Sequence, residues 1–91
     1  MKKIYVVAEH LLDAYDYYVT HRTEIVGDKQ GQTGLNGFYF EEVFNDAQVI
    51  CTTPHHVVVF GRCDRMYVTK NVKKENVDAL TKYADVLTQE G

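Results

Sequence analysis

The sequence predicts one small domain of the α/β or α+β class, built on a mixed β-sheet of about five strands. Three observations favour this class. The chain of 91 residues suits a single domain. Runs of β-branched and aromatic residues of strand length recur along it, and two stretches carry apolar residues at helical spacing. The expected order is β-α-β-(α)-β-β-β-α, with two main helices and one short one.

Strand and helix signals alternate at the start of the chain. Residues 3–8 are β-branched and aromatic, which is typical of a short buried strand. Apolar residues then recur every three or four positions, which predicts an amphipathic helix over residues 9–21. A β-favouring stretch at 23–26 suggests a crossover unit with two parallel strands. The apolar stripe of the helix is expected to contain Ala8, Leu11, Leu12, Tyr15, Tyr18 and Val19.

Glycines mark a loop after this unit. Four of the six glycines fall within residues 27–37, so a mobile loop is expected there. Residues 38–44 fit either a helical face or one side of a strand. A short helix is the preferred prediction, because Glu41 and Glu42 interrupt a strand alternation.

The second half of the chain predicts three strands. Residues 48–53, 56–60 and 65–69 are all β-prone. Residues 61–64 separate the last two as a hairpin turn would. The near-continuous apolar run at 57–60 suggests a central strand that is shielded on both faces.

Helical periodicity returns at the end of the chain. From Asn71 onward, Val77, Leu80, Ala84 and Leu87 fall on one stripe. This spacing predicts the second main helix, with Asn71 or a neighbour as its N-cap. Residues 1–91 are therefore interpreted as one globular domain.

Composition excludes several classes of protein. Ten Lys and Arg against 13 Asp and Glu give a formal net charge of −3, and 45 % of the residues are hydrophobic. This is the balance of an ordinary globular protein. No apolar run approaches the length of a membrane span. Glu9 interrupts the apolar run at the start of the chain, which is not typical of a secretory signal peptide. Two cysteines are too few for a disulfide framework, so a cytoplasmic location is expected.

No motif in the chain indicates a particular reaction or ligand. The glycines of the loop match neither the P-loop spacing nor the dinucleotide-binding spacing. Neither Cys-x-x-Cys nor His-x-x-x-His occurs, and serine is absent from the chain. We therefore expect no catalytic residues, no metal, no cofactor and no enzymatic activity, although a ligand at the glycine-rich loop stays open.

One helix face and the glycine-rich loop are the candidate binding surface. Tyr17 falls off the expected apolar stripe, beside acidic residues, and tyrosine is enriched at protein interfaces. The predicted function is a small accessory or inhibitor protein, of the kind found in phages, that occupies the surface of a partner protein. A homodimer is expected as well. The candidate partner-binding residues are Asp13, Asp16, Tyr17, Lys29, Gln30 and Gln32.

A concentration of basic residues supports an alternative prediction. These residues lie in the expected hairpin and at the start of the last helix, where they would neutralise phosphates. The alternative function is binding of RNA or another single strand. The residues concerned are Arg62, Arg65, Lys70, Lys73 and Lys74.

Overall fold

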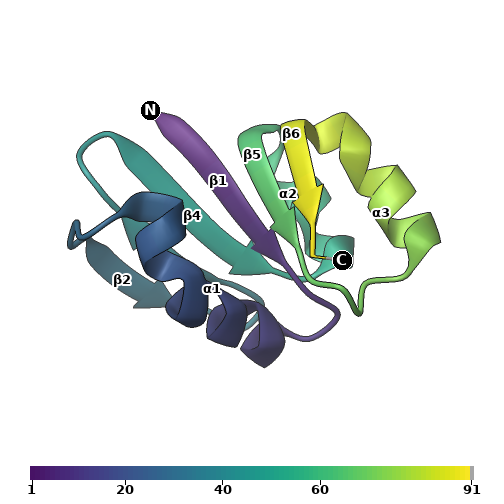
Figure 1. Ribbon diagram of the computed structural model, residues 1–91, viewed down its shortest axis with the longest axis horizontal. Coiled ribbons are helices and arrows are strands. Elements are labelled where there is room, and N and C mark those ends of the chain that lie inside the picture. Colours follow the sequence, from purple (N-terminus) through teal and green to yellow (C-terminus); the bar gives the residue numbers. More distant parts are fainter. Residues whose placement is uncertain (91) are drawn as a thin grey trace.

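A central strand, β1 (Lys2–Val7), organises the computed structural model, which describes residues 1–90. Within these residues the strands form one mixed six-stranded sheet in the order β2-β3-β4-β1-β5-β6 (Figure 1). The other strands are β2 (Gln32–Leu35), β3 (Phe40–Val43), β4 (Ala47–Thr52), β5 (Cys63–Val68) and β6 (Ala84–Gln89). The helices are α1 (Leu11–Val26), α2 (Val57–Phe60) and α3 (Lys74–Leu80), with single 3-10 turns at Pro54–His56 and Thr81–Tyr83.

The sheet combines a parallel half with an antiparallel half. β1 pairs in parallel with β4, with Lys2 opposite Ala47, and also with β5, with Ile4 opposite Arg65. β6 continues the parallel half beside β5. β2 and β3 form an antiparallel meander on the other side of β4. The chain therefore crosses over β1 between β4 and β5, and α2 lies in that crossover.

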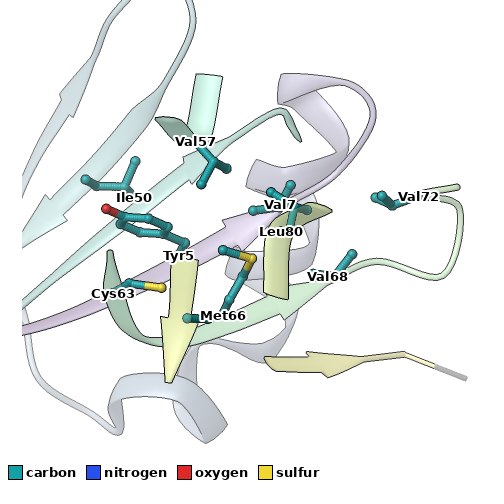
Figure 2. Packing of buried hydrophobic residues seen from close by; sticks show 10 residues of the cluster. Tyr5, Val7, Ile50, Val57, Cys63, Met66, Val68, Val72 and Leu80 are labelled. Atoms are coloured by element: carbon teal, nitrogen blue, oxygen red, sulfur yellow. The ribbon is translucent and has the colours of Figure 1, made fainter. Parts of the chain in front are cut away.

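Alternate side chains of β1 supply two cores. Ile4 and Val6 pack against α1 on one face of the sheet. Tyr5 and Val7 point to the other face and pack with Val57 of α2 and residues of α3 (Figure 2). All four β1 side chains are buried, so the sheet is covered on both faces at its centre.

The predicted fold class is confirmed: the chain forms a mixed sheet with two main helices and one short helix. There are six strands rather than about five in residues 1–90, and several elements differ from the prediction. β1 occupies the central, doubly shielded position that the sequence assigned to residues 57–60.

The predicted strand at 56–60 is wrong, because these residues form a 3-10 turn followed by α2. Pro54 occupies the first position of this helical segment, which its fixed φ favours. Gly61, with φ of 82°, ends the segment in a conformation that glycine tolerates best. The predicted hairpin turn at 61–64 is wrong too, since β5 already begins at Cys63.

Both main helices have different ends from those predicted. α1 continues through residues 23–26, where a second strand was expected, and stops at Gly27 with φ of 75°. Ile25 and Val26 pack against the core under α1, and this packing overrides their strand propensity. α3 ends at Leu80, so Ala84 and Leu87 of the predicted helical stripe lie in β6.

The glycine-rich region and the segment after it form a hairpin. Residues 32–35, which fall in the predicted loop, form the edge strand β2. The preferred short helix at 38–44 is wrong, and the strand alternative is right for residues 40–43. The alternation of apolar and polar residues expected of a strand is broken here, because a charged residue, Glu42, occupies a buried position.

Candidate functional site

Only part of the expected apolar stripe of α1 packs on the sheet: Tyr18 belongs to the stripe and is buried, whereas Leu12 and Val19 are not. Ala14 and Tyr18 are buried, whereas Leu12 and Val19 are 74 % and 52 % exposed. The small side chain of Ala14 allows α1 to approach the sheet closely. The buried face of the helix is therefore turned towards Ala14 and Tyr17, away from Leu12 and Val19.

A buried polar cluster fixes this rotation. Glu42 of β3 lies under α1 and accepts a hydrogen bond of 2.6 Å from the Tyr18 hydroxyl. Arg22 donates to both carboxylate oxygens of Glu42, from Nε at 2.9 Å and from Nη2 at 2.8 Å. The Arg22 guanidinium holds the pKa of the Glu42 carboxyl below its ordinary value. Tyr18 and Arg22 must both face β3, and this requirement sets the rotation of α1 around its own axis.

One glycine of the loop completes the cluster. The Gly31 amide donates to Glu42 Oε2 at 3.1 Å. A β-carbon at this position would lie 2.6 Å from the carbonyl oxygen of Val43, so only glycine fits without a shift of the backbone. Gly31 thus allows the loop to pack closely against β3.

The rotation of α1 leaves an apolar surface in water, which we call the α1 apolar surface. Tyr15, 39 % exposed, packs edge-on against Phe40 with ring centroids 4.7 Å apart. Phe40 lies opposite Leu35 in the β2–β3 pairing, so both side chains are on the α1 side of the sheet. Leu35 is 80 % exposed. The surface consists of Leu12, Tyr15, Val19, Leu35 and Phe40.

Three of the predicted partner-binding residues lie together on the other flank of α1. Asp13, Asp16 and Tyr17 line a shallow groove of about 250 Å³ whose far wall includes Lys70. Tyr17 does not point away from the core as predicted. It is half-buried, packs against the core under α1 and stacks on His21 at 4.1 Å.

The remaining predicted partner-binding residues are elsewhere. Lys29, Gln30 and Gln32 line an open depression of about 930 Å³ beyond the C-terminal end of α1. Lys29 is also paired with Asp46 at 2.8 Å. Tyr17 lies nine residues before the end of α1, about 14 Å along the axis. The two predicted groups therefore do not form one continuous surface.

The basic residues of the alternative prediction are dispersed. Arg62 pairs with Asp85 at 2.6 Å near the start of β5. Arg65 lies within β5, where its guanidinium stacks over Tyr67. Lys70 and Lys73 belong to the connection between β5 and α3, and Lys74 begins α3. Arg62 precedes β5 and Lys70 follows it, so the basic residues are spread from one end of this strand to the other.

Both cysteines are buried and lie in the sheet. Burial raises the pKa of Cys51 to about 12 and that of Cys63 to about 11. The thiolate, which is the reactive form, is therefore scarce at neutral pH. Within residues 1–90 no group of His, Cys, Asp or Glu is arranged to hold a metal ion, and no helix is long and apolar enough to cross a membrane.

The cysteines yield a direct prediction. In the folded protein at about pH 8, Cys51 and Cys63 should resist alkylation by iodoacetamide, because each is buried and protonated. Mass spectrometry should find both labelled once denaturant unfolds the chain. Rapid labelling of Cys63 under native conditions would contradict its place in the core.

No protein-family profile, curated protein or solved structure matches this chain. The candidate site therefore rests on the geometry of α1 and of its neighbours β2 and β3.

Proposed function

We propose that this protein is a non-enzymatic binding module that acts, as an accessory or inhibitor protein, by occupying the surface of a partner protein. The exposed α1 apolar surface is the observation that carries this proposal. Leu12, Val19 and Leu35 are each more than half exposed, and Tyr15 and Phe40 connect them. Contiguous apolar patches on small proteins mark interaction sites, because covering them removes apolar area from water.

One charge beside this surface supports a basic partner, that of Asp16, which neighbours Leu12 and Val19 on α1. Asp13 and Glu24 are also exposed on α1, on the flank where Tyr17 lies. None of the three takes part in an ion pair within residues 1–90. The unbridged cysteines fit a protein of the reducing cytoplasm.

The double variant Leu12→Gln/Val19→Gln tests the proposal. Both side chains are exposed, so the stability should change by less than about 0.5 kcal/mol. Capture of the partner by tagged protein, from a nuclease-treated lysate of the source cell, should fall by tenfold or more, on the order of 1.4 kcal/mol. Calorimetry and quantitative mass spectrometry measure the two effects.

The matched control is Val58→Gln. Val58 is 61 % exposed on α2, on the opposite face of the sheet, and its replacement should leave capture unchanged. Equal capture by wild type and the double variant, or retention of nucleic acid alone without nuclease, would reject the proposal.

A further inference from the structure

The sheet is unevenly covered on the side where α1 lies. α1 packs mainly on β1 and β4, and it reaches β3 through the side chains of Tyr15, Tyr18 and Arg22, which places its axis near β4. No helix of residues 1–90 covers β2 on this side, and Thr33 and Leu35 are exposed. We call this uncovered part of the sheet, between α1 and the free edge at β2, the strip.

The width of this strip matches one helix. Neighbouring strands are about 4.8 Å apart, and β2 lies two strands beyond β4, so its offset from β4 in the plane of the sheet is about 10 Å. Packed helices have axes about 8–10 Å apart. A helix beside α1 would therefore lie over β2, with Leu12 and Val19 beside it and Leu35 beneath it.

A helix fits the exposed groups better than an added strand does. A strand that extends the sheet would pair with the backbone edge of β2. It would lie in the plane of the sheet and leave Leu12 and Val19, which stand on α1 above that plane, in water. A helix with its side chains is about 10 Å across, so it can contact Leu12 and Val19 on α1 and Leu35 on β2 at the same time.

One exposed carboxylate borders the strip, that of Asp16, which also lines the groove beside Tyr17. Asp16 is four residues after Leu12 and three before Val19, so it is their neighbour on the helix surface. Asp16 is exposed and takes part in no ion pair within the described residues. A lysine or arginine on the solvent side of a docked helix would lie close to this carboxylate.

We infer that the partner segment is a basic amphipathic α-helix that packs beside α1 and over β2. This inference rests on the protein-binding function proposed above and specifies the chemistry of the partner. The apolar stripe of the helix covers Leu12, Tyr15, Val19 and Leu35, and its basic border faces Asp16.

Three fluorescent peptides of about 18 residues test the inference against the full chain by anisotropy. The first has leucine and lysine at helical spacing. The second has the same composition in strict alternation, and the third has glutamate in place of lysine at helical spacing. The first should bind about tenfold more tightly than either of the others, because only it matches both the apolar period and the charge.

Variants locate the binding. Leu12→Gln/Val19→Gln should lower the affinity for the first peptide by about tenfold or more. Asp16→Lys should abolish the difference in affinity between the first peptide and the glutamate peptide. Val58→Gln should leave its affinity unchanged. Equal or tighter binding of the alternating peptide would overturn the helix in favour of strand addition to β2, and binding unaffected by the double variant would overturn the site.

The outcome is separable from that of the proposed function. If the helical peptide fails while lysate capture still depends on Leu12 and Val19, the helix inference is wrong and the binding function stands. If capture is also insensitive to these residues, the binding function itself is wrong.

Discussion

Replacing Tyr5 by alanine should cost about 3–5 kcal/mol of the free energy of unfolding, the range seen when a large buried aromatic side chain is truncated. Tyr5 is fully buried in the central strand, packs edge-on with Phe60 at 6.2 Å between ring centroids, and donates a hydrogen bond of 2.9 Å to the Gly61 carbonyl. Burial raises its pKa to about 12, so the hydroxyl remains a donor at all ordinary pH values. The whole free energy of unfolding of a protein domain is roughly 5–15 kcal/mol, so this loss would be a large part of it.

Tyr5→Phe separates packing from the hydrogen bond. This variant keeps the ring and removes only the hydroxyl, so it should lose about 1 kcal/mol. Urea unfolding followed by circular dichroism measures both variants. A loss below about 1 kcal/mol in Tyr5→Ala would contradict the central place of β1 in the core.

Replacing Glu42 by alanine should cost about 3 kcal/mol, because it leaves charged and polar partners without their acceptor. The Glu42 side chain is 7 % exposed and receives hydrogen bonds from Tyr18, Arg22 and Gly31. Arg22 is 27 % exposed, so partial hydration places the loss at the lower end of the range for broken buried ion pairs. The thermal midpoint should fall by about 12 °C or more.

Glu41→Ala is the matched control. Glu41 is the neighbouring residue in β3 and points to the other side of the sheet, where it accepts a hydrogen bond from Gln48 at 3.0 Å. Its loss should cost less than about 1 kcal/mol. Equal losses for Glu41→Ala and Glu42→Ala would show that the buried cluster does not hold α1 in place.

The same cluster predicts a pH dependence. Arg22 lowers the pKa of the folded Glu42 carboxyl below the value in the unfolded chain. Its contribution to stability is therefore fully present above the ordinary glutamate pKa and is lost as the pH falls through the folded pKa. Wild-type stability should decline more steeply below about pH 4 than that of Glu42→Ala.

Local sequence signals were sufficient for much of the sheet. The β-branched and aromatic composition of residues 3–8, 48–53 and 65–69 correctly predicts β1, β4 and β5. Residues 57–60 have the same composition and are helical. The difference lies in Pro54 and Gly61, which favour the start and end of a helix, and in the parallel pairing of β1 with β4 and β5, which requires a crossover.

The candidate surface was less accessible to prediction. Hydrophobic periodicity placed Leu12 and Val19 in the core because it ignores charged residues that are buried in pairs. Arg22 and Glu42 are 20 positions apart, and their pairing depends on the register of β3 with β4. The spacing of four between Ala14, Tyr18 and Arg22 is the signal that could have indicated the true buried face.

The position of Leu35 has a similar explanation. Residues 32–35 are short and contain Gly34, so their strand propensity is weak. Their strand forms through antiparallel pairing with β3, which places Leu35 opposite Phe40. This register depends on the pairing of two strands, which the hydrophobic pattern of residues 32–35 alone does not show.

Site-specific photo-crosslinking tests the central claim, that the α1 apolar surface binds a partner protein. Because both native thiols are buried, a photoreactive maleimide should modify Leu12→Cys selectively. Illumination in a lysate of the source cell should join position 12 to one protein, while Val58→Cys on the opposite face should not capture it. No protein product from position 12, or the same product from both positions, would contradict the claim.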